Sequence, residues 1–245
     1  MGKFTDQTFR TKILLITNII TGAILIGFLL SDKYTQQTYS IHNPPIKRHS
    51  FLDNTSYIEQ TDFYTVYVGQ KNIVMFGNSL TYRINWGELL ERTDVANRGI
   101  GSDITSGFIN RLNFVLNLHP KFCFIEGGVN DIAFNINQDS TIRNLNYIVH
   151  TLLNNKIKPV LMTVTYVTKS YPNAIIFNQK IKVLNKQIIK ISKEKGISLI
   201  DLNLRLTDGE FLSPEYAVDD GIHFKSKAYL IWKAEILKVL EQEKI

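Results

Sequence analysis

Cysteine is almost absent from this chain, since Cys123 is the single one among 245 residues. One cysteine cannot form an internal disulfide, so a disulfide-stapled scaffold is excluded and the cysteine content does not report the cellular compartment. Cys123 lies within the apolar run Phe122–Ile125. We therefore expect a small buried side chain there, not a reactive thiol.

Signals for nucleic-acid binding are also missing. The sequence has no zinc-ligand spacing, recognition-helix pattern or interleaving of aromatic and basic residues, and it has no internal repeat. The net charge is nevertheless +6. Several lysines recur at helical spacing, which is typical of a solvated helix face; these are Lys180, Lys182, Lys186, Lys190, Lys193 and Lys195. We therefore expect no nucleic-acid partner.

The N-terminal region contains one long run without charge, from Ile13 to Leu30. As a helix, roughly 18 residues span ~27 Å, close to the ~30 Å hydrocarbon core of a bilayer. Lys3, Arg10 and Lys12 precede the run, which favours a cytoplasmic N-terminus and an exported remainder. The sequence therefore predicts a cytoplasmic segment at 1–12, a transmembrane signal anchor at 13–30 and a single-pass membrane protein.

Two alternatives remain for this run, namely a cleaved signal peptide, which would give a secreted form, and a buried core helix. The run is longer than an ordinary signal-peptide core, and Leu29–Asp32 is a poor cleavage site.

Residues 31–64 are polar, include Pro44 and Pro45 and show no sustained periodicity. We interpret them as a stalk or linker, with room for local structure near its end, followed by a domain at 65–245.

Strand and helix patterns alternate through that domain. Short apolar runs predict strands at 72–76, 121–126, 159–167 and 197–202. Apolar residues at steps of three and four predict four helices between and after them; their markers are Phe108, Leu112 and Val115; Leu145, Ile148 and Leu152; Phe177, Ile181, Leu184, Ile188 and Ile191; and Tyr229, Trp232, Ile236 and Val239. This alternation predicts an α/β fold with a parallel sheet that is covered on both faces.

Chemically suggestive residues follow the predicted strands. Ser79, Ser102 and Asn130 each come just after a strand, and His223 precedes the last helix. In parallel sheets, ligands bind in the loops at the carboxyl ends of the strands. We therefore expect these four residues to converge at one edge of the sheet.

Ser79 and the segment Asp220–His223 have the residue types of a nucleophile, a base and an orienting carboxylate. A hydroxyl is a weak nucleophile and needs a base such as histidine, whose tautomer a carboxylate can fix. Taken alone, Ser79 is also explained as an ordinary helix cap, and the Asp–His spacing arises by chance in many chains. Asp219 competes with Asp220 for the carboxylate role, and the spacing favours Asp220.

Two further loops could stabilise negative charge. Gly127–Asp131 places the side-chain amide of Asn130 after a strand, where it could donate to an oxyanion, although a glycine–asparagine turn is common at such a place. Asn97–Asp103 is rich in glycine, which allows a tight loop with its backbone N–H groups turned into a site.

The four segments together resemble the SGNH (GDSL-type) hydrolase family, across roughly Asn72 to the C-terminus. The blocks of that family occur in order as Gly77–Leu80, Asn97–Asp103, Gly128–Asp131 and Asp220–His223. The resemblance implies a flavodoxin-like three-layer α/β/α sandwich and serine-ester chemistry without a metal or cofactor. It implies that Ser79 is the nucleophile, His223 the general base and then acid, and Asp220 the orienting carboxylate.

The resemblance also implies an oxyanion hole made of the Ser79 N–H, a backbone N–H of the second block and the Asn130 side chain. The chain departs from the family pattern at two positions. Asn78 replaces the usual aspartate, and Ser102 stands where a glycine usually donates to the oxyanion, with Gly101 as the fallback donor. Asp103 and Asp131 are expected to fix loops.

We expect a serine esterase that removes a short acyl group, with acetyl as the favoured one, from a carbohydrate, with its catalytic domain on the exported side of a membrane. Three alternatives remain: an O-acyltransferase of the same class, a lysophospholipase or lipase-like acylhydrolase, and a non-catalytic binding module. A lipid ester is the alternative substrate to an acetylated glycan.

Overall fold

The computed structural model describes residues 21–22, 25–31, 33 and 49–243. The chain divides into two units, Met1–Arg48 and His49–Ile245. Of the predicted transmembrane segment 13–30, the structure describes only 21–22 and 25–30, and the predicted cytoplasmic segment 1–12 lies outside the described residues. Residues 25–31 are helical and exposed. Within the described ranges, no helix is both long enough and apolar enough to cross a bilayer.

The second unit is built on a parallel sheet of five strands in the order β2-β1-β3-β4-β5. Their bounds are Ile73–Gly77 (β1), Val95–Gly99 (β2), Phe122–Glu126 (β3), Lys158–Met162 (β4) and Ser198–Ile200 (β5). Every residue of β1 and β3 is buried, as expected for central strands with helices on both faces. This order is that of flavodoxin-like doubly wound sheets, so the predicted parallel α/β fold is confirmed.

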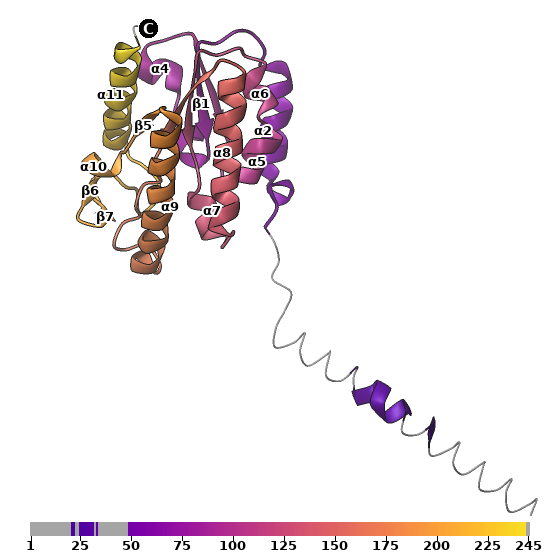
Figure 1. Cartoon of the computed structure of the whole chain (residues 1–245). Helices are drawn as coiled ribbons and strands as arrows, with labels where there is room; N and C mark the ends of the chain where they lie inside the picture. Colours follow the sequence, from indigo (N-terminus) through magenta and orange to yellow (C-terminus); the bar gives the residue numbers. More distant parts are fainter. Residues whose placement is uncertain (1–20, 23–24, 32, 34–48, 244–245) are drawn as a thin grey trace, which may run out of the picture. The chain divides into compact units, whose positions relative to one another are not determined.

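Alternate residues of the central strands enter two separate cores. Val74 and Phe76 belong to one core, and Ile73 and Met75 to the other, because successive side chains of a strand point to opposite faces. Helices α8 (Gln138–Asn154) and α9 (Ala174–Lys195) cover the first face, and α11 (Ser226–Gln242) and α4 (Trp86–Leu90) cover the second (Figure 1). Cys123 is fully buried in the first core, as predicted.

Shorter elements connect these layers. They are η1 (Phe51–Asp53), α2 (Thr55–Val66), α3 (Ser79–Tyr82), α5 (Thr105–Asn110), α6 (Asn113–Leu116), α7 (Val129–Ala133), α10 (Asn203–Leu206), β6 (Thr207–Asp208) and β7 (Phe211–Leu212). Three of the four predicted helices are confirmed as α8, α9 and α11. The stripe marked by Phe108, Leu112 and Val115 is instead divided between α5 and α6, with the break at Arg111.

The predicted strand 159–167 was too long, because β4 ends at Met162. Beyond it, side chains replace the neighbouring strand as backbone partners. The Asn185 amide accepts from Val164 N and donates to Val164 O, each at 2.8 Å. Asn178 bonds the N–H and the carbonyl of Val167 in the same way. The apolar run alone predicts a continuous strand, because the sequence does not show that side chains take over the backbone hydrogen bonds after Met162.

The boundary predicted between the linker and the domain also differs from the structure. The compact unit begins at His49 rather than at residue 65. Tyr57 and Tyr64 of α2 are buried, and the Tyr64 hydroxyl donates to the Gly99 carbonyl at 2.8 Å. Two widely spaced tyrosines make this contact, and they leave no regular apolar stripe in the sequence, so periodicity does not mark α2 as part of the unit.

Candidate active site

Three side chains that are far apart in the sequence form one hydrogen-bonded chain. Ser79 follows β1 at the start of α3, and His223 lies in the loop before α11. The Oγ of Ser79 lies 2.9 Å from Nε2 of His223. On the other side of the ring, Nδ1 of His223 lies 2.6 Å from Oδ2 of Asp220. This is the order of contacts that a nucleophile, a base and an orienting carboxylate require.

Asp220 also shapes its own loop. Its Oδ1 accepts the backbone N–H groups of Ile222 and His223, at 3.0 and 2.9 Å. Partial burial opposes ionisation of the carboxyl, but these two bonds and the His223 ring outweigh it and hold the Asp220 pKa below its ordinary value. Within residues 49–243, Asp219 makes no hydrogen bond to His223, so the choice of Asp220 over Asp219 agrees with the geometry.

Gly221 lets this loop pack closely against the segment after β4. Its φ is +75°, and a Cβ at this position would lie 2.4 Å from the Thr168 hydroxyl oxygen. The Thr168 N–H donates to the Gly221 carbonyl at 2.8 Å. Any larger residue would therefore be strained and would push the loop, and the imidazole that it carries, away from Ser79.

The nucleophile turn has a similar steric requirement. A Cβ on Gly77 would lie 2.1 Å from Thr81 Oγ1 and 2.7 Å from the Glu126 carbonyl oxygen. Asn78 caps α3, because its Oδ1 accepts the Leu80 N–H at 2.9 Å. The turn thus exposes Ser79 at the carboxyl edge of the sheet, where the first N–H groups of a helix are unpaired.

Backbone N–H groups without acceptors gather at the same edge. In the part of the chain that the structure describes, the N–H groups of Ser79 and Ser102 have no hydrogen-bond acceptor. Ser102 has a φ of +57°, in the left-handed region that glycine usually occupies. Its loop is tied to the nucleophile strand, because the Ile100 N–H donates to the Gly77 carbonyl at 3.1 Å.

Asn130 connects the two loops of the candidate oxyanion hole. Its Nδ2 donates one hydrogen to the Asp103 carbonyl at 2.8 Å, and a side-chain amide has a second hydrogen to donate. Gly101, the fallback donor, accepts from Asn54 through its carbonyl at 2.8 Å.

Asp103 and Asp131 are buried and bind protein groups, as predicted for residues that fix loops. Asp131 accepts from the Thr105 hydroxyl at 2.6 Å and from the Thr141 hydroxyl at 3.1 Å. Burial raises the Asp131 pKa, and these bonds oppose that shift. The carboxylate therefore joins α7, which carries Asn130, to α5 and α8.

Arg111 is a site-supporting residue that the sequence did not reveal. Its Nε bonds Asp103 at 2.7 Å, and its two terminal nitrogens donate to the carbonyls of Arg98 and Gly77, at 2.6 and 2.9 Å. Both side chains of the ion pair are almost fully buried. Burial raises the Asp103 pKa, whereas the Arg111 guanidinium lowers it. Arg111 thereby links the second loop to the end of the nucleophile strand.

Sequence comparison decides the family. The sequence profile of the GDSL-like lipase/acylhydrolase family matches residues 75–231, which include all of these site residues. The chain belongs to this family. It is therefore an ester hydrolase, and the predicted SGNH/GDSL resemblance is confirmed. A search of curated proteins gives no match to the sequence.

Solved structures of GDSL hydrolases share the fold. A GDSL-like lipase from Bacteroides thetaiotaomicron is 26% identical with a TM-score of 0.68, and the alignment covers 76% of this chain and 98% of that one. A lipase/acylhydrolase from Enterococcus faecalis is 25% identical with a TM-score of 0.63, covering 71% and 97%. An acetyl xylan esterase is 18% identical with a TM-score of 0.59, covering 69% and 98%, which shows a shared fold alone.

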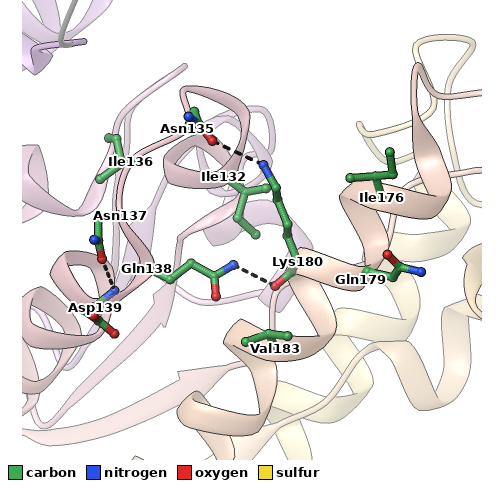
Figure 2. Close-up of a pocket in the computed structure, with 10 residues that line it drawn as sticks. All are labelled: Ile132, Asn135, Ile136, Asn137, Gln138, Asp139, Ile176, Gln179, Lys180 and Val183. Atoms are coloured by element: carbon green, nitrogen blue, oxygen red, sulfur yellow. Dashed lines mark hydrogen bonds between the residues drawn. The ribbon is translucent and has the colours of Figure 1, made fainter. Parts of the chain in front are cut away.

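A cavity of about 720 Å³ lies between α7, the start of α8 and the N-terminal half of α9 (Figure 2). In the GDSL fold of this chain these segments lie at the end of the sheet where β3 and β4 finish (Figure 1). Isoleucine and valine side chains line the cavity together with four carboxamides, Asn135, Asn137, Gln138 and Gln179. Lys180 crosses it and donates to Asn135 Oδ1 at 3.3 Å. Within the described residues, no cluster of three histidine, cysteine or acidic side chains could hold a metal ion.

Proposed function

We propose that this GDSL hydrolase is a serine esterase that works through an acyl-enzyme, with Ser79 as nucleophile, His223 as base and acid, and Asp220 as orienting carboxylate. The observation that supports it is the continuous contact from Ser79 Oγ through His223 to Asp220, at 2.9 and 2.6 Å. The lowered pKa of Asp220 keeps that carboxylate ionised at neutral pH, where it stabilises the imidazolium that forms during the reaction.

The reaction proceeds in two steps, acylation of Ser79 and hydrolysis of the acyl-enzyme. Ser79 Oγ attacks the ester carbonyl while its proton passes to His223 Nε2, and the collapsing intermediate expels the alcohol, which takes that proton. Water then attacks the acyl-serine and gives a proton to the same nitrogen. The second intermediate releases the carboxylic acid, and Ser79 recovers its hydroxyl hydrogen.

Negative charge on the tetrahedral intermediate is assigned to three donors. They are the N–H groups of Ser79 and Ser102 and the second hydrogen of the Asn130 amide. Donors that are held in place before the reaction cost no reorganisation when the charge develops, and the loss of one typically lowers kcat by about 10²–10³.

For the substrate, we propose an acetyl ester carried by a carbohydrate. The support is the cavity beside α7, which carboxamide, aliphatic and two charged side chains line, because amides can both donate to and accept from sugar hydroxyl groups. Its lining includes none of the triad or oxyanion-hole residues, so the proposal places the sugar there and not the reacting ester. The fold shared with an acetyl xylan esterase agrees with this choice.

The test compares the full chain with its Ser79→Ala variant. We expect Ser79→Ala to lower p-nitrophenyl acetate hydrolysis by roughly 10³-fold or more while leaving the melting temperature nearly unchanged. Ser56→Ala, at an exposed position of α2, is the matched control. A Ser79→Ala variant that stays active would overturn the proposal.

Substrate class is then read from a screen of acetylated oligosaccharides, lysophospholipid and model esters of increasing chain length. We expect acetylated oligosaccharides to have the highest kcat/KM. A preference for lysophospholipid contradicts the carbohydrate proposal. Faster transfer of acetyl to an added sugar than release of acetate identifies an acyltransferase.

We further propose that the run Ile13–Leu30 anchors the enzyme in a membrane with its hydrolase domain on the exported side. The support is the uncharged sequence and the basic residues before it. Full-length protein should remain in membranes after an alkaline carbonate wash, and a chain that begins at residue 49 should be released. An N-terminus beginning near Ser31 on the mature protein would instead identify a cleaved signal.

A further inference from the structure

Glu126 is a buried carboxyl residue beside the nucleophile turn, and no step of the proposed reaction uses it. It ends β3 and pairs in register with Gly77, the last residue of β1. Its side chain is at the protein interior, with 4% of the residue exposed. A carboxyl group at such a place is costly unless hydrogen bonds satisfy it.

Three donors from the nucleophile turn satisfy this carboxyl. The Asn78 side-chain Nδ2 donates to Oε1 at 2.9 Å. The Asn78 backbone N–H and the Thr81 hydroxyl donate to Oε2, at 3.4 and 3.3 Å. Residues 78 and 81 lie on either side of Ser79, so one carboxyl group holds both sides of the turn that carries the nucleophile.

The amide of Asn78 is oriented by its two partners. Its oxygen accepts the Leu80 N–H at 2.9 Å, and its nitrogen therefore faces Glu126. Asn78 is fully buried, so water cannot replace either contact. An aspartate could keep the bond to Leu80 but would set a second carboxyl oxygen against Glu126.

We propose that Glu126 is a positioning residue for Ser79, and that Asn78 stands in place of the family's aspartate because it must donate to this buried carboxylate. The inference rests on the proposed function. It explains the departure from the family pattern by a contact on β3, not by a change in chemistry at the serine.

Burial and hydrogen bonding act on the ionisation of Glu126 in opposite directions. Burial raises the Glu126 pKa from its ordinary 4.5 to about 7, opposed by the bonds from Asn78 and Thr81. Among residues 49–243, Glu126 has no ion-pair partner. The titratable group that its charge affects is Tyr229 of α11, whose hydroxyl donates to the Leu80 carbonyl at 2.8 Å and whose pKa is raised by burial and then by Glu126.

The raised pKa determines how Glu126 contributes to stability. The unfolded chain loses this proton near pH 4.5 and the folded chain near pH 7. Folding is therefore favoured most below about pH 4.5, and the contribution decreases as the pH rises to about 7. A second carboxyl at position 78 would raise the apparent pKa of the pair further, because two adjacent buried carboxyls cannot both ionise readily.

The test reverses the polarity of the pair. In Asn78→Asp the two carboxyls share a proton at low pH, and two acceptors face each other once that proton is lost at high pH. In the double variant Asn78→Asp with Glu126→Gln the glutamine amide donates to the aspartate at every pH tested. Each full-length variant is reacted with a fluorophosphonate between pH 5 and 9 and assayed for kcat on p-nitrophenyl acetate. A displacement of ~1 Å can cost about 10²-fold, so we expect Asn78→Asp to react at least ~10-fold more slowly at pH 8 and the double variant to recover to within about threefold.

Asn85 provides a matched control, because its Nδ2 also donates to a glutamate, Glu88, at 2.6 Å, but on an exposed helix start. Asn85→Asp should leave the fluorophosphonate rate and its pH profile unchanged, since water screens the like charges. An Asn78→Asp rate equal to that of the unaltered chain across the pH range overturns the proposal. A double variant no better than Asn78→Asp alone also overturns it.

Two outcomes separate this proposal from the proposed function. If Ser79 of the unaltered chain neither reacts with the probe nor cleaves esters, the proposed function fails. The contact between Asn78 and Glu126 is then tested by the melting temperatures of the variants. Asn78→Asp must lower the melting temperature more at pH 8 than at pH 5, and Glu126→Gln must restore it. If Asn78→Asp does not fold, the double variant must fold, and failure of both overturns the pairing.

Discussion

Ser102 places a side chain where the backbone favours glycine. Its φ of +57° lies in the left-handed region, which costs an L-residue roughly 1–2 kcal/mol. The same conformation belongs to the loop whose free N–H is assigned to the oxyanion hole. Strain of this kind persists only where surrounding contacts hold it, and it is concentrated at functional sites.

Replacing Ser102 with glycine should relieve this strain. The gain is offset in part by the larger entropy of glycine in the unfolded chain, so we expect the free energy of unfolding to rise by about 0.5–1 kcal/mol. The donor is a backbone N–H that glycine keeps, so kcat should change less than about twofold. Urea unfolding and p-nitrophenyl acetate hydrolysis measure the two effects.

Lys156→Gly is the control for the Ser102 variant, because Lys156 has a φ of +60° on the exposed surface after α8. It should give a similar gain in stability with no effect on kcat. A large loss of kcat in Ser102→Gly alone would show that the serine side chain itself takes part in the reaction.

At the scale of elements, the break between α5 and α6 makes room for a buried ion pair. Arg111 occupies the break and bonds Asp103 and two carbonyls, while its guanidinium lies over the rings of Phe76 and Phe108 at 4.5 and 4.9 Å. The apolar stripe in the sequence predicted one continuous helix. Arginine is a good helix former, so the local sequence did not mark the break, and the partners of Arg111 could not be read from spacing.

Arg111→Met should be strongly destabilising, because it leaves the buried Asp103 carboxylate without a counter-charge. The removal of one partner of a buried pair typically costs about 3–5 kcal/mol. The pair Arg92–Asp94 provides the control, because its side chains are half-buried, 26% and 28% exposed, and Arg92→Met should cost about 1 kcal/mol. Urea unfolding at pH 7 measures both, and equal costs would contradict the structural role of Arg111.

Sequence patterns located the main secondary structure well where one face of an element is apolar and the other polar. Helices α8, α9 and α11 were predicted from such stripes. The strand β4 was predicted too long, because Asn178 and Asn185 end the ladder with side-chain bonds to the residues after it. Periodicity reports which side chains are buried and not which groups satisfy the backbone.

At the scale of the whole molecule, the hydrolase unit includes a segment, α2, that lies almost entirely within the linker predicted from the sequence. Helix α2 packs through Tyr57 and Tyr64 against Ile100, next to Phe51 and Phe114. Ile100 belongs to the loop that carries Ser102, so α2 supports one wall of the candidate oxyanion hole from outside.

Truncation tests this boundary directly. A chain that begins at residue 49 should keep its melting temperature and activity. A chain that begins at residue 67 loses α2 and the buried area of its two tyrosines, and burial of one large side chain is worth about 1.5–3 kcal/mol. We therefore expect a loss of several kcal/mol and a fall in kcat, measured by urea unfolding and ester hydrolysis. Equal stability of the two chains would show that the folded domain begins near residue 65, as the sequence predicted.

The sequence alone determined the fold class, the family and the order of the candidate site residues. Alternation of apolar runs and stripes follows from local geometry, and the blocks around Ser79, Asn130 and His223 survive as short local patterns. Tertiary structure alone decided the contact of Ser79 with His223 across 144 positions, the burial of α2, and the roles of Arg111 and Glu126. These depend on which groups meet when distant segments pack, and the spacing of residues along a chain does not carry that information.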